Sequence, residues 1–275
     1  MPQKYPALRR AGALAGAMLL LAAAAPQVLA ESISMRFDVN VSGMKAMKLT
    51  FDGDIGKSSY SGHARLKPRG FAKLFIKKSF SLSVKGRLND DHVRPEQFSM
   101  TIRKKKEERV ATVRWSNGRL AQWRRTPPKS KAWRQEVLRA LKGGVMDPLS
   151  MLVRFARARS GNFCKGRVRI FDGHDVYDII ARSMGGKNVR TRVYSGPALV
   201  CRLKYVPVAG QSDKKRRRRL ADPPLYITYL ARVKSADSGA LYVPVRVEGR
   251  FDGRPFVAEP VTATLGGKAL VPAGR

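Results

Sequence analysis

Most of the chain after residue 30 alternates between apolar and polar residues with a period of two. Ile33, Met35, Phe37, Val39 and Val41 are the apolar half of one such segment. Successive side chains of an extended strand point to opposite faces of a sheet, so this alternation predicts strands with one buried and one polar face. The pattern recurs at residues 47–51, 80–84, 98–102, 168–170, 199–205, 226–233, 242–247 and 256–263.

Short turn signals separate these segments. Phe-Asp-Gly occurs three times, at residues 51–53, 171–173 and 251–253, and Ser116-Asn117-Gly118 adds a fourth signal. Asp-Gly and Asn-Gly tolerate the positive φ angles that tight hairpin turns require. We therefore predict a meander in which neighbouring strands are antiparallel.

One interval breaks the alternation and has helical spacing. It begins after Pro127-Pro128, which ends the first group of strands, and Gly143-Gly144 ends its first helix. The apolar residues that share one face of this helix are Trp133, Val137, Leu138 and Leu141. A second helix is predicted to start at Asp147-Pro148, because Asp suits the N-cap and Pro the first helical position, and to stop at Gly161. Its apolar stripe is Leu149, Leu152, Val153 and Ala156.

These patterns predict a mainly β fold: a curved antiparallel sheet or incomplete β-barrel, with two helices packed on it after the N-terminal group of strands. We expect a single β-rich domain over residues 31–270. It would comprise N-terminal strands in 31–126, a helical segment in 130–160 and C-terminal strands in 163–270.

The first thirty residues have the pattern of a secretory signal peptide. Lys4, Arg9 and Arg10 precede an apolar run over residues 11–25, and small residues lead up to Ala30. The run is shorter than the roughly 20 residues that a membrane-spanning helix needs. We predict cleavage after Ala30, export to the periplasm and no transmembrane segment in the mature chain.

The mature chain is strongly basic. The leader holds three of the 55 Lys and Arg residues and none of the 20 Asp and Glu residues, which leaves a net charge of +32. Such charge in a cytosolic protein would indicate nucleic-acid binding, but an exported protein meets anionic lipid headgroups, lipopolysaccharide and cell-wall polymer instead. The alternative is a solvated surface whose charge serves solubility alone.

Two cationic runs, residues 103–106 and 214–219, stand out within this charge. The run 214–219 lies between Gly210 and Pro223-Pro224, a context that predicts a surface loop. Like charges in such a run also repel one another. Each run is either a solvated surface or a contact for an anionic envelope surface. The residues are Arg103, Lys104, Lys105, Lys106, Lys214, Lys215, Arg216, Arg217, Arg218 and Arg219.

Cys164 and Cys201 are the only cysteines. An even, minimal count in an exported chain favours one disulfide. Zinc binding is the weaker interpretation, because no His lies within a few residues of either Cys and neither belongs to a Cys-x-x-Cys pair.

The sequence contains no recognisable catalytic motif. His63, His92 and His174 form no metal-binding spacing, and the acidic residues are few and scattered. Asp172-Gly173-His174-Asp175 is the best polar cluster, but a hairpin turn explains it as well. We predict no catalytic residue, metal or cofactor.

Three motifs in the C-terminal half resemble the exported bacterial family called domain of unknown function 3108. They are Asp147-Pro148-Leu149-Ser150 with Phe155, Arg169-Ile170-Phe171-Asp172-Gly173 before Tyr177-Asp178, and Tyr194 with Cys201 and the segment 206–210, ahead of Tyr242-Val243-Pro244-Val245. The resemblance spans most of the mature chain and implies a periplasmic, mostly antiparallel β protein. Its motifs are structural signatures, and the run 214–219 departs from the family pattern.

Two function classes follow. The first is a non-enzymatic binding protein that shelters a hydrophobic or amphipathic envelope molecule, such as a lipid, lipoprotein or lipopolysaccharide, inside the half-barrel. The second is an envelope-integrity scaffold that binds proteins or cell-wall polymer through its surface. An empty apolar interior would favour the first, and a filled interior the second.

Overall fold

The computed structural model describes residues 30–89, 92–158, 164–236, 239–251 and 253–272. The predicted leader, apart from Ala30, and the predicted helix stop at Gly161 lie outside these residues. The strands are β1 Glu31–Val41, β2 Met44–Ile55, β3 Ser59–Pro68, β4 Lys78–Asn89, β5 His92–Lys104, β6 Glu107–Ser116, β7 Arg119–Thr126, β8 Gly166–Phe171, β9 Val176–Arg190, β10 Ser195–Ala209, β11 Leu225–Ser235, β12 Gly239–Phe251, β13 Arg254–Leu265 and β14 Lys268–Ala269. The helices are α1 Ala72–Phe75, α2 Lys131–Ala140, α3 Pro148–Ala156 and α4 Asp213–Ala221.

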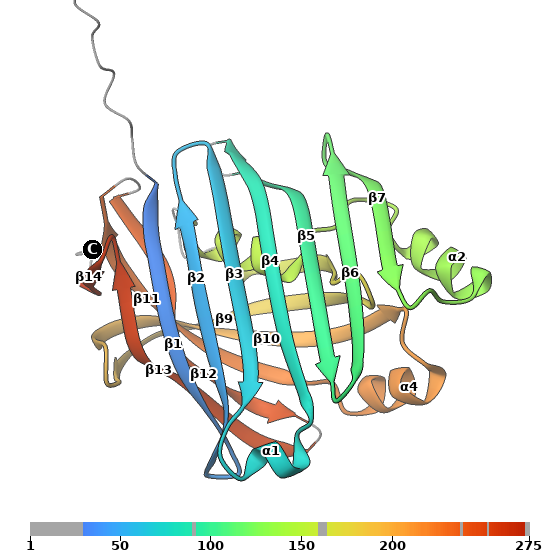
Figure 1. Cartoon of the computed structure of the whole chain (residues 1–275). Coiled ribbons are helices and arrows are strands. Elements are labelled where there is room, and N and C mark those ends of the chain that lie inside the picture. The colour runs from blue at the N-terminus through green and yellow to red at the C-terminus, as the bar shows by residue number, and fades with distance from the viewer. Residues whose placement is uncertain (1–29, 90–91, 159–163, 237–238, 252, 273–275) are drawn as a thin grey trace, which may run out of the picture.

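All fourteen strands belong to one antiparallel sheet. Thirteen follow the order β7-β6-β5-β4-β3-β2-β1-β13-β12-β11-β10-β9-β8, and β14 pairs with β13. The sheet is a meander except at its centre, where β1 pairs with β13 from Ile33–Leu265 to Val41–Phe256. Figure 1 shows β1–β7 in front and β9–β12 crossing behind them. This strongly curved, unclosed sheet confirms the predicted fold class, and β7 and β8 are its two edges.

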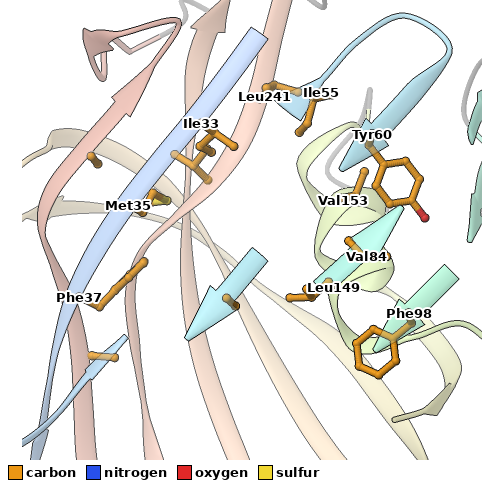
Figure 2. Packing of buried hydrophobic residues seen from close by; sticks show 14 of the residues in the cluster. Ile33, Met35, Phe37, Ile55, Tyr60, Val84, Phe98, Leu149, Val153 and Leu241 are labelled. Carbon is orange, nitrogen blue, oxygen red and sulfur yellow. The ribbon is translucent and has the colours of Figure 1, made fainter. Parts of the chain in front are cut away.

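Helix α3 lies inside the curve of the sheet. It contacts β4 and β5 of the front half and β8 and β12 of the rear half. Leu149 and Val153 face Val84 and Phe98 in this core (Figure 2), and all four side chains are buried. The predicted helix start is confirmed, since Asp147 is the N-cap and Pro148 begins the helix. Leu152 of the predicted apolar stripe is instead 43% exposed, whereas Met151 and Phe155, on another side of α3, are buried.

Aromatic side chains bring the two sheet edges together. Trp123 of β7 packs edge-on against Phe171 of β8, with ring centroids 5.1 Å apart. The Trp123 Nε1–H group donates to the Gly173 carbonyl over 3.0 Å. Helix α2 covers this contact through Trp133, whose ring centroid lies 5.5 Å from that of Trp123. Leu138, predicted on the apolar face of this helix, is 40% exposed.

The structure agrees with some of the predicted turns and contradicts one of them. Asn117 and Gly118 adopt φ angles of 51° and 74° between β6 and β7, and residues 171–173 lead from β8 into the turn before β9. Phe251 ends β12 at the third predicted turn, where Asp252 lies outside the described residues. The turn predicted at residues 51–53 is wrong, because these residues continue β2. Asp52 there accepts hydrogen bonds from Ser34 and Arg36 of β1, each over 2.8 Å.

Cys164 and Cys201 form the predicted disulfide. Their Cα atoms are 5.6 Å apart, and both residues are fully buried in a second, smaller core cluster beside α3 and β8–β11. A disulfide is typical of an oxidising, exported location. Within the described residues, no helix is long and apolar enough to cross a membrane.

Candidate functional site

The topology carries both predicted cationic runs to the same end of the sheet. Lys104, at the end of β5, pairs with Lys78 at the start of β4. The β10–β11 connection that contains α4 leaves the sheet at the same end, because β-strand direction alternates along the meander. We call this end the basic rim and define it by the β1–β2, β3–β4, β5–β6 and β10–β11 connections. In Figure 1 it is the lower end of the molecule, marked by α1 and α4.

The first cationic run forms the turn between β5 and β6. Arg103 to Lys106 are all exposed, and Lys105 has a φ angle of 53°. Arg103 Nε lies 2.5 Å from Glu108 Oε2 across the hairpin. The other three side chains of this run extend the positive charge of the rim into solvent.

The second cationic run is a helix, so the predicted loop is wrong. Residues 213–221 form α4, and partners distant in sequence offset the repulsion between its charges. Lys215 Nζ pairs with Asp175 over 2.8 Å, and Arg216 pairs with Glu136 of α2 over 3.1 Å. Arg219 is buried, with its guanidinium 5.9 Å from the centre of the Tyr205 ring. Lys214, Arg217 and Arg218 remain exposed.

The structure adds a third cationic segment to the rim that the sequence patterns did not indicate. Residues 67–78 cover the end of β3, the β3–β4 connection and the first residue of β4, and they include five Lys or Arg residues and no acidic residue. They surround α1, a single helical turn. This connection has neither strand nor long-helix periodicity, so periodicity could not indicate it. The sequence feature that could have indicated it is the density of Lys residues around Phe71, Leu74 and Phe75.

The polar cluster Asp172-Gly173-His174-Asp175 forms the turn between β8 and β9. Asp172 Oδ1 accepts the backbone N–H groups of His174 and Asp175 over 2.8 and 2.7 Å, which fixes the turn. Gly173 has a φ of 82°, and a Cβ atom there would lie 2.5 Å from that of Ala111. The cluster therefore has the role of a close-packed turn. Among the described residues, no group of three His, Cys, Asp or Glu side chains is arranged to hold a metal ion.

Burial shifts the pKa values of His174 and Asp172 in this turn. It lowers the pKa of His174 to about 4, with a further contribution from the Arg125 charge. Within the described structure, neither ring nitrogen of His174 has a hydrogen-bond partner. Burial, together with the Asp175 charge, raises the pKa of Asp172 to about 7. The folded turn thus favours a neutral imidazole ring.

We expect acidification to destabilise the wild type more than the His174→Gln variant. Between pH 6.5 and 4 the unfolded chain binds a proton at His174 that the folded chain does not, so this contribution to stability falls as the pH falls. Asp172 has the opposite slope, because its raised pKa lets the folded state hold a proton there. Urea unfolding of both proteins at several pH values isolates the His174 contribution as their difference. The variant His92→Gln, at an exposed position, should parallel the wild type, and a parallel His174→Gln curve would contradict the expectation.

Comparison with known proteins identifies the family. The family model described as protein of unknown function, DUF3108, matches residues 36–253. The chain belongs to the DUF3108 family. No curated protein and no solved structure matches it.

The first of the three motifs that resemble the DUF3108 family forms the buried start of α3. Asp147 Oδ1 accepts the backbone N–H groups of Leu149 and Ser150, each over 2.9 Å, and Ser150 Oγ donates to Asp147 Oδ2. The Tyr60 hydroxyl lies 2.6 Å from Ser150 Oγ and links α3 to β3. Burial raises the pKa of Asp147 to about 6, against hydrogen bonds that lower it. This DUF3108 signature positions the helix inside the sheet.

The other DUF3108 signatures also stabilise the fold. Arg169 Nε and Nη2 donate to the two carboxylate oxygens of Asp178 over 2.8 and 3.2 Å, across the β8–β9 pair. The Tyr194 hydroxyl donates to the Pro197 carbonyl over 2.7 Å at the β9–β10 turn. Gly210 has a φ of 90°, and its carbonyl accepts from Trp133 Nε1 over 2.8 Å. These contacts explain the motifs as structural elements of this fold.

Proposed function

We propose that this protein is a non-enzymatic protein of the bacterial envelope that binds an anionic envelope component through its basic rim. The observation that carries the proposal is the gathering of the two cationic runs at one end of the sheet. Repulsion between like charges opposes such an arrangement, and a bound polyanion offsets it. Lipid headgroups, lipopolysaccharide phosphates and acidic cell-wall polymer have the complementary chemistry.

The geometry favours this surface over the interior of the half-barrel. Helix α3 and the side chains around it occupy the space between the two halves of the sheet. A depression of about 400 Å³ lies over β1–β5, and its lining includes Ile33 and Val84 as well as polar residues such as Asp52. A lipid held inside the sheet would require α3 to move, whereas the basic rim is already exposed.

We also propose a periplasmic location after removal of residues 1–30. The leader has the charge, apolar run and small residues that export requires. The Cys164–Cys201 disulfide supports an oxidising compartment, of which the periplasm is one.

Vesicle sedimentation tests the proposed binding. We expect the protein to sediment with phosphatidylglycerol-containing vesicles and not with pure phosphatidylcholine vesicles. Salt should weaken the binding, because the Debye length falls from about 30 Å at 0.01 M to about 8 Å at physiological ionic strength. Equal sedimentation with both vesicle types would contradict the proposal, and so would binding to neither vesicle type, to lipopolysaccharide nor to acidic cell-wall polymer.

A charge variant of the rim locates the interaction. Replacing Lys104, Lys106, Lys214 and Arg217 by Gln should weaken binding to anionic vesicles at least about tenfold at low salt, since each basic residue near such a surface contributes up to about 1 kcal/mol. All four side chains are exposed, so the melting temperature should not change.

The matched control removes the same charge from the opposite end of the sheet. Lys57, Arg119, Lys187 and Lys268 are exposed there, and replacing them by Gln should reduce binding far less than the rim variant does. Equal losses in the two variants would show that net charge alone, and not the rim, determines the attraction.

A further inference from the structure

The connection between β3 and β4 exposes large apolar side chains at the basic rim. Phe71 is 87% exposed, Phe75 84% and Leu74 65%. Helix α1, which carries two of them, contacts β2, where Met44 is 72% exposed. We call Met44, Phe71, Leu74 and Phe75 the apolar wedge. Exposed apolar residues clustered at one tip are typical of a binding surface, whereas single ones are ordinary.

The apolar wedge is held in a defined position. Arg69 N–H donates to the Ala46 carbonyl over 2.8 Å, and the Ile76 N–H donates to the Ala72 carbonyl over 2.7 Å to close the helical turn. Asp38 of β1 binds both flanks of the wedge, with Arg69 Nη1 at 2.8 Å and Lys45 Nζ at 3.2 Å. The wedge therefore projects from two adjacent connections that share one carboxylate anchor.

Cations surround the wedge on both sides. Lys67 and Arg69 precede its aromatic residues, Lys73 lies between them, and Lys77 and Lys78 follow. All five side chains are exposed. The β5–β6 turn, with its own Lys residues, lies next along the rim, because Lys78 pairs with Lys104.

We infer that the apolar wedge inserts into the interface of an anionic lipid bilayer while the surrounding cations contact the headgroups. Aromatic and aliphatic side chains favour the boundary between headgroups and acyl chains, and basic residues beside them are attracted to anionic lipids. A second copy of the chain is not a suitable partner for the wedge, because the Lys and Arg residues around the two wedges would face and repel each other. This inference rests on the proposed function and selects the lipid surface among its anionic targets.

A triple variant tests the apolar contribution. Phe71→Ser, Leu74→Ser and Phe75→Ser together should weaken binding to vesicles of phosphatidylglycerol and phosphatidylcholine at least tenfold. The binding that the wild type retains at high salt should be lost, because apolar burial is not screened. Since the three side chains are exposed, the circular dichroism spectrum and melting temperature should match the wild type. Met184→Ser with Val271→Ser removes exposed apolar groups elsewhere and should leave binding unchanged.

Tryptophan fluorescence tests the insertion of the wedge separately from vesicle binding. Trp115 and Trp123 are buried and Trp133 is half-buried, so Phe75→Trp adds an exposed fluorophore at the wedge. On anionic vesicles its emission should shift to shorter wavelength, and brominated acyl chains should quench it.

The possible failures are distinguishable. Wild-type protein that does not bind anionic vesicles would overturn this inference, and it would overturn the proposed function as well if the protein also fails to bind lipopolysaccharide and acidic cell-wall polymer. Binding that the rim charge variant loses, but the triple wedge variant keeps, would overturn only the insertion. If the added fluorophore of the vesicle-bound Phe75→Trp variant is not quenched by the brominated acyl chains, the insertion is overturned as well.

Discussion

Replacing Cys164 and Cys201 by Ala should lower the free energy of unfolding by about 4 kcal/mol. The disulfide closes a loop with a sequence separation of 37, and the entropy that this link removes from the unfolded chain sets the expected loss. The link joins Cys164, just before β8, to the middle of β10 through a fully buried site. Urea unfolding of the oxidised wild type and the double variant measures the difference.

Reduction of the disulfide separates the effect of losing the covalent link from the effect of replacing the two cysteine side chains. Wild-type protein in dithiothreitol should unfold at nearly the urea concentration of the double variant, and dithiothreitol should not affect that variant. If reduced and oxidised wild type unfold together, the disulfide contributes no stability and the expectation is wrong.

Replacing Phe98 by Ala should destabilise the protein by about 3–5 kcal/mol, the usual cost of removing a fully buried aromatic ring. Phe98 is completely buried on β5, one of the strands that α3 contacts, and Leu149 lies beside it in Figure 2. The expected loss combines the burial of the ring with the cavity that remains between sheet and helix. Phe71→Ala is the matched control: the same side chain, 87% exposed, should change stability by less than about 0.5 kcal/mol.

A double-mutant cycle tests whether sheet and helix pack as one unit. If α3 is an integral part of the core, Phe98→Ala and Leu149→Ala should be coupled by about 0.5–3 kcal/mol. Additive losses, or a loss below about 1 kcal/mol for Phe98→Ala, would show that the sheet does not depend on α3.

The alternation of apolar residues was sufficient to predict the fold class. Ile33, Met35 and Phe37 are buried along β1 as expected, because a half-buried strand requires apolar residues at every second position of its sequence. The Asp147-Pro148 pair likewise predicted the start of α3, since capping depends on neighbouring residues alone. The turn at residues 51–53 failed because hydrogen bonds from another strand, to Asp52, override local turn preference.

The candidate site was less predictable because it depends on contacts between distant residues. Helix α4 forms with help from Glu136 and Asp175, which no local pattern connects to residues 214–219. The gathering of charge at one rim follows from the number of strands between the two cationic runs, and β6, β7 and β9, which lie between them, had not been predicted as separate strands. The apolar wedge lies in a connection, where periodicity carries no information.

The pairing of β1 with β13 has a consequence for the order in which this chain acquires its structure. A chain that emerges N-terminus first can complete the meander from β1 to β7 while β13, the second partner of β1, is still more than a hundred residues away. Until β13 arrives, β1 is an open edge whose backbone groups can pair with any other extended chain. The step that closes this edge is the formation of contacts between the two ends of the sequence, which is slow for topological reasons. Chaperones that shield extended segments would therefore act on this protein at its first strand, from the synthesis of β1 until β13 arrives.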